Sequence, residues 1–196
     1  MGKDFVTSLR PAVVLTVLFA ILLGLLYPLA MTGIGQALFP SQANGSLVRD
    51  AAGRVIGSTV VGQAFTSDRY FNTRPSAAGS HGYDGLASSG SNLGPASQAL
   101  AGRVGLDVAK RRAQGVTGPV PADMVTASGS GLDPDVSPEN ARAQIARVAR
   151  VRRLEPGQVA ALVERNVERP LPGILGAPHV NVLALNRQLD RLGGAR

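Results

Sequence analysis

The chain has 196 residues, of which 20 are Lys or Arg and 13 are Asp or Glu, and its formal net charge at neutral pH is +7. It contains no cysteine, which excludes a disulfide framework and any zinc site built on cysteine ligands. A basic balance of this size commonly indicates nucleic acid or an anionic surface as the partner. The patterning of the first fifty residues decides between these two.

Residues 11–31 form an uncharged, predominantly apolar segment that is about as long as a helix needs to cross a bilayer. Lys3 and Arg10 precede this segment, with a single aspartate against them, and the next charged residue is Arg49. By the positive-inside rule residues 1–10 stay in the cytoplasm and the rest of the chain is extracytoplasmic, in the periplasm of a bacterium. We therefore expect a single-pass protein of the inner (cytoplasmic) membrane, with the lipid bilayer as a partner and nucleic acid out of reach.

A secretory signal peptide is the alternative interpretation of the same segment. Signal peptides have apolar cores of about 7–15 residues, and this segment is longer. Gly33 and Gly35 would offer a peptidase a pair of small residues, but retention as an anchor is the expected outcome. Pro28 lacks an amide donor and is predicted to kink or end the helix near Tyr27, so that residues 32–45 form a juxtamembrane linker.

Small side chains recur at every fourth position of the predicted span. Such a row lets helix backbones approach closely in lipid, which favours a partner transmembrane helix. The alternative is chance, since any apolar helix contains some small residues. The predicted helix-packing face consists of Ala12, Thr16, Ala20 and Gly24.

The remaining residues, 46–196, are enough for one extracytoplasmic domain with its own core. Two short β-prone runs at 46–49 and 54–61 flank Asp and Gly residues that favour a hairpin. The predicted fold class is α/β or α+β, a small mixed domain of two or three strands and about four helices. Helices are predicted at 95–114, from Ser137-Pro138-Glu139 onward, at about 158–167, and in a last segment capped by Asn186. A strand is predicted at 179–185. Residues 116–136 are predicted to be irregular.

Chemistry at the serines is a second hypothesis, in which the chain is a membrane-anchored extracytoplasmic hydrolase. Ser128 or Ser130, one of the histidines His81 and His179, and an aspartate would supply a nucleophilic triad. However, the serines do not lie in the Gly-x-Ser-x-Gly elbow that such enzymes place between a strand and a helix. The two histidines are far apart in the sequence and form no metal-ligand pair, so no metal site is predicted.

An acidic interval lies between Arg112 and Arg142, where the chain has no basic residue. One interpretation is local, because acidic residues favour turns and stabilise helix N-termini. The other is a loop that faces a partner or attracts cations. The residues assigned to this possible partner-facing loop are Asp123, Ser128, Ser130, Asp133, Asp135 and Glu139.

Several motifs together resemble the potassium-transporting ATPase C chain, the C subunit of the Kdp high-affinity potassium pump. The resemblance covers nearly the whole chain in order, beginning with the single N-terminal span. It rests on Gly57-Ser-Thr-Val-Val-Gly-Gln-Ala-Phe65, Tyr70-Phe71, Arg74-Pro-Ser-Ala77, Tyr83-Asp84, Ser91-Asn-Leu-Gly-Pro95, Val120-Pro121, Val125-Thr-Ala-Ser-Gly-Ser-Gly-Leu-Asp-Pro134, Ser137-Pro138, Gln144, Arg147-Val-Ala149, Val180-Asn-Val-Leu183 and Leu185-Asn186.

The resemblance implies an accessory, non-catalytic subunit that works with a channel-like potassium-translocating subunit and a P-type ATPase subunit. The family is also described as a catalytic chaperone that raises the ATP affinity of the pump subunit, with the glutamine matching Gln144 as a nucleotide contact. ATP is then a cofactor of the complex, and none is assigned to this chain alone. An extracytoplasmic domain conflicts with a direct contact between Gln144 and cytoplasmic ATP, so any effect on the ATPase would pass through the complex.

Overall fold

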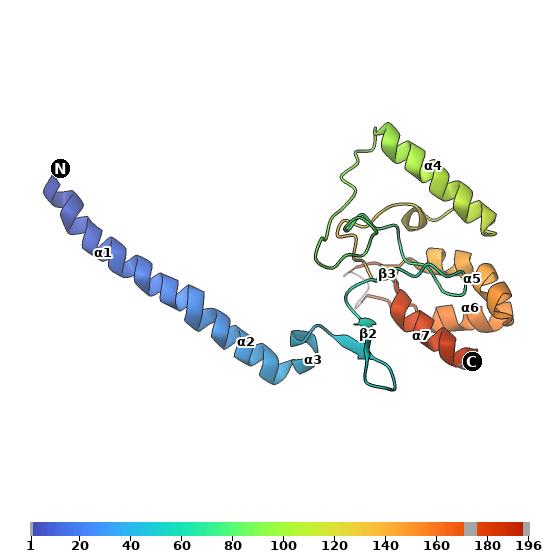
Figure 1. Ribbon diagram of the computed structural model, residues 1–196, viewed down its shortest axis with the longest axis horizontal. Coiled ribbons are helices and arrows are strands. Elements are labelled where there is room, and N and C mark those ends of the chain that lie inside the picture. Colours follow the sequence, from blue (N-terminus) through green and yellow to red (C-terminus); the bar gives the residue numbers. More distant parts are fainter. Residues whose placement is uncertain (1, 171–175, 194–196) are drawn as a thin grey trace. The chain divides into compact units, whose positions relative to one another are not determined.

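The computed structural model describes residues 2–170 and 176–193. The chain forms two compact units, Met1–Leu47 and Val48–Arg196. The first unit is helical, and the second holds the strands, the remaining helices and the hydrophobic core (Figure 1).

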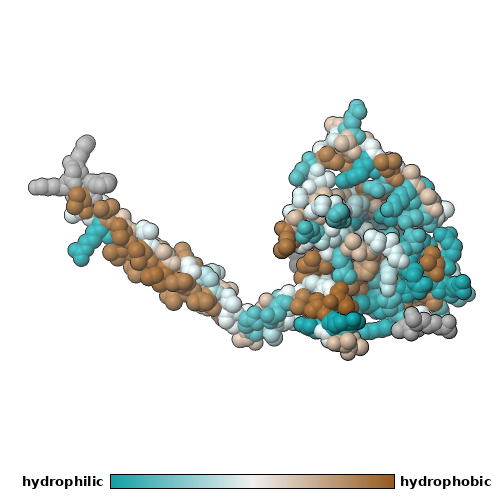
Figure 2. Space-filling view, viewed as in Figure 1, coloured by the Kyte–Doolittle hydropathy of each residue, from teal (hydrophilic) through white to brown (hydrophobic). Residues whose placement is uncertain are grey.

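One long helix dominates the first unit, built from α1 (Gly2–Ile21), the π-helical turn η1 (Leu22–Leu26) and α2 (Tyr27–Leu38). Hydrophobic residues cover most of the helix on the face shown in Figure 2. Its apolar part, Val6–Leu38, has 33 residues with a mean hydropathy of 2.6, and within the described residues it is the one helix long and apolar enough to cross a bilayer. At about 1.5 Å per residue it is longer than the roughly 30 Å hydrocarbon core, so it can cross with a tilt or project beyond the core.

The helix continues past Pro28, whereas the sequence predicted that it would kink or end near Tyr27. The π-helical turn lies directly before the proline, and the backbone N–H of Tyr27 donates to the carbonyl of Leu22, five residues back. This local widening accommodates a residue that lacks an N–H donor, so the helix is irregular there and does not end. Residues 32–38 of the expected linker are therefore helical, and a short helix, α3 (Pro40–Ala43), follows them.

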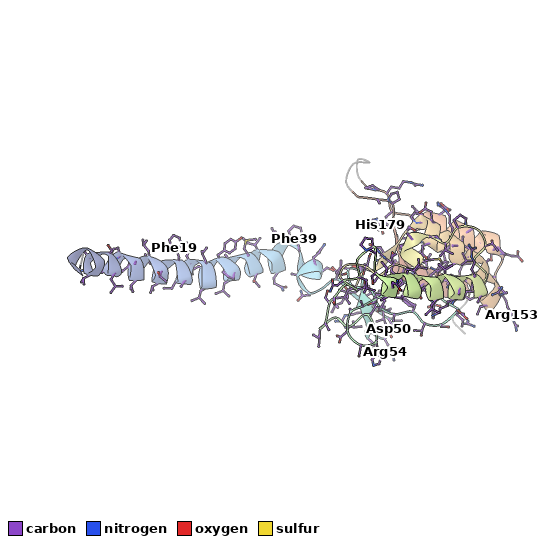
Figure 3. All side chains as sticks on the ribbon, turned by 90° about the horizontal axis from the view of Figure 1, so that it is seen from above. Phe19, Phe39, Asp50, Arg54, Arg153 and His179 are labelled. Atoms are coloured by element: carbon purple, nitrogen blue, oxygen red, sulfur yellow. The ribbon has the colours of Figure 1, made fainter. Side chains whose placement is uncertain are left out.

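The predicted hairpin is confirmed as the pair β1 (Leu47–Arg49) and β2 (Val55–Ser58). Asp50 closes its turn, because Oδ1 accepts from the backbone N–H groups of Ala52 and Arg54, and Oδ2 lies 2.8 Å from the Arg54 guanidinium (Figure 3). The backbone donor of Arg54 is the main reason that the pKa of Asp50 lies below its ordinary value. Large apolar side chains on and after this hairpin are exposed: Leu47, Val55, Ile56, Val60 and Val61.

The main core lies among three helices, α5 (Pro138–Arg152), α6 (Pro156–Arg165) and α7 (Val182–Leu192). A second two-stranded sheet closes it, in which β3 (Asp135–Val136) runs antiparallel to β4 (Val180–Asn181) with Val136 opposite Val180. The buried apolar residues of this core are Phe71, Val136, Ala141, Val148, Ala149, Val159, Leu162, Val163, Val180, Val182, Leu185 and Leu189.

Helix α4 (Gln98–Ala113) is attached through a smaller cluster, in which Val104 and Val108 pack against the buried residues Val116, Met124 and Val125. The Oγ of Ser97 caps this helix by accepting from the N–H of Leu100, and Ser137 caps α5 in the same way from Asn140. Both helices therefore form where the sequence predicted them. The expected mixed fold of short strands and several helices is confirmed.

Two predicted segments differ from the structure. The strand predicted at 179–185 is reduced to β4, because the side chain of Asn181 accepts from the N–H of Ala184 and starts α7 there. Asn186, predicted as the cap, lies inside α7, where its amide accepts from and donates to the backbone of Phe71. The interval 116–136, predicted as irregular, contains the 3₁₀ turn η2 (Ala122–Met124) and β3.

Candidate functional site

The predicted helix-packing face is uncovered in the first unit. Side chains from 6 to 34 are all exposed, and a Cβ added at Gly24 would touch nothing in the chain. The hydroxyl of Thr16 donates to the carbonyl of Ala12 at 2.8 Å, which satisfies its polar group within the helix. The face is thus apolar and free of side-chain bulk.

Asp123 is fully engaged within the domain. Its carboxylate accepts from the backbone N–H of Ser137 at 2.7 Å, from the Ser137 hydroxyl at 2.9 Å and from the Asn140 side chain at 3.0 Å. These bonds fix the first turn of α5 to η2. The local interpretation of the acidic loop therefore accounts for this residue.

Asp133 and Asp135 also have partners. Asp133 Oδ2 lies 2.9 Å from Arg74 Nη1, and its Oδ1 accepts from the backbone N–H of Asp135. Asp135 accepts from the side chain of Asn181 and lies 3.9 Å from His179 Nε2. Burial raises the pKa of Asp135 above its ordinary value, and the hydrogen bond from Asn181 opposes this rise.

The fold brings the four acids of the loop to one pocket of about 470 Å³. Glu139 is exposed at its edge and lies 3.8 Å from Arg142. Ser128 and Ser130 are not among the lining residues; the lining includes Asp123, Asp133, Asp135, Glu139, Arg74 and His179. The acidic interval of the sequence is therefore also an acidic surface, with carboxylates outnumbering cations. Across residues 2–170 and 176–193 no group of three His, Asp or Glu side chains has the arrangement of a metal site.

The serines do not form a catalytic arrangement with the histidines. Ser128 is 6% exposed, and the Ser130 hydroxyl accepts from the N–H of Leu132 in its own turn. His179 (Figure 3) faces Glu168 and Asp135, with its Nε2 3.6 Å from Glu168 Oε2. In the described residues no hydrogen bond joins either serine to His81 or His179, so the hydrolase hypothesis gains no support from the geometry.

Gln144 lies at the centre of a buried polar network on α5. Its Oε1 accepts from the backbone N–H of Asn72 at 2.8 Å and from Arg147 Nη2 at 2.6 Å. Its Nε2 donates to the Asn72 carbonyl at 3.1 Å and to Asn140 Oδ1 at 2.8 Å. The side chain is 3% exposed, and both polar atoms are occupied by the protein. Its role as a nucleotide contact stays a prediction.

Sequence reasoning missed the two residues that complete this network, Asn72 through its backbone and Arg147 through its guanidinium. Arg147 is 5% exposed and donates to the carbonyls of Asp68 and Tyr70, so α5 is bonded to a segment more than seventy residues earlier. Burial lowers the pKa of Arg147, opposed by the charge of Asp68. The available signal was the spacing of Asn140, Gln144 and Arg147, which places three polar residues on one face of a helix.

Comparison with known proteins identifies the family. Residues 9–191 match the family described as K+-transporting ATPase, c chain. The chain belongs to this family. Curated relatives described as potassium-transporting ATPase KdpC subunits include one from Caulobacter vibrioides, 56% identical over 94% of this chain and 93% of the relative. Another, from Allorhizobium ampelinum, is 54% identical over 97% of this chain and 99% of the relative. A third, from Myxococcus xanthus, is 54% identical over 99% of this chain and 90% of the relative.

The resemblance stated from the sequence is therefore confirmed. The chain is a subunit of a potassium-transporting ATPase, and it is an accessory subunit rather than the catalytic one. The one long apolar helix found in the described residues fits a single-pass membrane protein.

Proposed function

We propose that this subunit supports the assembly and turnover of a high-affinity potassium uptake complex, in which it binds a channel-like potassium-translocating subunit and a P-type ATPase subunit. The observation that supports this proposal most is the match of residues 9–191 to the family, together with an apolar helix whose side chains have no cover within the chain. A helix that meets neighbours in the bilayer anchors the subunit and holds the second unit at the membrane surface.

The acidic pocket supplies a second proposed contact. Asp123 is committed to capping α5, whereas Asp133, Asp135 and Glu139 keep part of their carboxylates exposed at the pocket, where a partner or cations can reach them. We propose that this surface faces the potassium-translocating subunit near the side from which potassium enters. Negative charge there would raise the local cation concentration at low ionic strength.

An effect on ATP affinity would be indirect under the proposed topology. With the second unit extracytoplasmic, Gln144 is on the opposite side of the membrane from cytoplasmic ATP. The family's chaperone role would then be transmitted through the assembled complex, with the cofactor ATP held by the ATPase subunit. The packing of Gln144 favours this indirect role, because its amide atoms already have protein partners.

Copurification tests the proposed function. A tagged chain, solubilised from its native membrane in mild detergent, is expected to bring down both partner subunits and a potassium-stimulated ATPase activity. The matched control is a tagged version that begins at Val48, the start of the second unit, and therefore lacks the apolar helix. Recovery of the intact chain alone, with no ATPase activity, would contradict the proposal.

The topology has its own test, which is simple because the chain has no native cysteine. Ala96 is exposed and lies next to the α4 cap without taking part in it, so Ala96→Cys should leave the fold intact. We expect this cysteine to react with a membrane-impermeant thiol reagent in intact spheroplasts. Ser8→Cys, which precedes the uncharged residues 11–31, should react only after lysis. The reverse pattern would show that the second unit is cytoplasmic.

A further inference from the structure

A second pocket, of about 340 Å³, lies between the last turns of α4 and the segment 64–83. Three permanently cationic side chains line it, Arg74, Lys110 and Arg111, together with His81 and one carboxylate, Asp107. Basic residues in the last turn of a helix normally compensate the helix dipole while remaining in solvent. Arg111 differs from that pattern, because its side chain is partly buried.

The described residues place no carboxylate within ion-pair distance of the Arg111 guanidinium, and Asp107, one turn earlier on α4, acts on it only through its charge. The guanidinium donates to three neutral acceptors: Gln114 Oε1 at 3.1 Å, Asn72 Oδ1 at 3.4 Å and the carbonyl of Met124 at 3.5 Å. Its buried Nε has no hydrogen-bond partner in the described residues. Burial lowers the pKa of Arg111, and the charge of Asp107 opposes this only in part. A desolvated cation without a counter-ion is costly, and an anion in the pocket would offset that cost.

Other cationic side chains add to the positive charge at this pocket. The Arg74 guanidinium pairs with Asp133 through Nη1, and its buried Nε is also left without a partner. Lys110 is exposed and forms no ion pair within the described part of the chain, so its ammonium group is available at the rim. Arg147 lies close enough to Arg111 for their charges to repel, which shows that positive charge accumulates on this side of the domain.

We propose that this pocket binds the phosphate group of an anionic ligand, either free inorganic phosphate or the headgroup of an anionic phospholipid. Guanidinium groups match the geometry of phosphate oxygens and bind them with charge-assisted hydrogen bonds, and a lysine adds a mobile point charge. Amide and hydroxyl side chains, those of Asn72 and Thr73, make up more of the wall, which suits a phosphate better than an apolar ligand. This site goes beyond the proposed assembly role, which requires no anion.

The test uses the full chain in nanodiscs and titrates inorganic phosphate by calorimetry at low ionic strength. In phosphatidylcholine nanodiscs the wild type should bind phosphate saturably. Lys110→Gln should weaken binding about threefold and Arg111→Gln at least about tenfold, because the second loses a guanidinium inside the pocket. Arg165→Gln removes the same charge from an exposed position on α6 outside the pocket and should leave binding unchanged.

A second arm distinguishes the two sources of phosphate. If the ligand is a lipid, nanodiscs containing phosphatidylglycerol should abolish the phosphate titration and raise the thermal unfolding temperature of the wild type by more than that of Lys110→Gln. If Arg111→Gln fails to fold, Lys110→Gln decides the outcome alone. The absence of saturable binding in both arms, or equal weakening in the Arg165→Gln control, would overturn the proposal.

Discussion

Replacing Gln144 with alanine should destabilise the second unit by about 3 kcal/mol, the largest effect that we expect from a single polar substitution in this chain. The change removes four hydrogen bonds and leaves the guanidinium of Arg147 and the backbone of Asn72 with fewer partners in the interior. Each buried donor or acceptor left unsatisfied costs about 1–3 kcal/mol, more when it is charged. Thermal and urea unfolding of the full chain in detergent measure the loss.

Gln158→Ala is the matched control, because the same side chain is exposed on α6 and should change stability by less than about 0.5 kcal/mol. The pair of variants also separates the two interpretations of Gln144. A structural role predicts that assembly and ATPase activity fall together with stability. If the Gln144→Ala chain is as stable as the wild type while the KM of the complex for ATP rises, then Gln144 acts on nucleotide binding. Its hydrogen bonds within the domain would then not be its main role.

The helices of the second unit were predictable because their signals are local. Ser97 and Ser137 are side-chain caps whose acceptor function requires only the next three residues, and both α4 and α5 begin at them. The hairpin was predictable for the same reason, since Asp50 closes its turn with donors that lie within four residues. Helix α6 likewise followed from its apolar spacing.

The errors arise where distant residues decide the structure. The sequence predicted Asn186 as the helix cap, but the backbone of Phe71, more than a hundred residues away, occupies its side chain, and Asn181 caps α7 instead. The long helix continues past Pro28 because of a π-helical turn, and the spacing of apolar residues in the sequence does not predict such a turn. The position of Arg111 in the last turn of a predicted helix also does not show that its side chain is partly buried without a counter-ion.

For the candidate site, the sequence predicted an acidic surface but not which of its carboxylates form hydrogen bonds within the domain. The sequence shows a run of carboxylates, and in the fold all four line the pocket while Asp123 also binds the first turn of α5. Gln144 was singled out only by resemblance. Its partner Arg147 lies one turn later on α5, but Asn72 comes from a segment 72 residues earlier that meets α5 only in the folded domain, so the network is a tertiary property.

The second large effect concerns the small-residue face of the long helix. Ala20→Leu or Gly24→Leu should reduce recovery of the partner subunits with a tagged chain roughly tenfold or more. If a neighbouring helix packs closely on this face, a branched side chain separates the two backbones and overpacks the contact, which costs about 1–3 kcal/mol. Each 1.4 kcal/mol corresponds to a tenfold change in the equilibrium constant.

Two controls lie on another side of the same helix. At 100° per residue Leu18 and Leu22 fall on a face away from the row of small residues. Leu18→Phe adds bulk there and Leu22→Ala removes it, so together they test whether any change of volume in the span disturbs assembly. Both controls should copurify as the wild type does. Because side chains from 6 to 34 have no cover in the chain itself, the Leu variants have no contact within the subunit to lose. Equal recovery of all four variants would show that this face does not pack against a neighbour, and the subunit would then have to be held in the complex by its second unit.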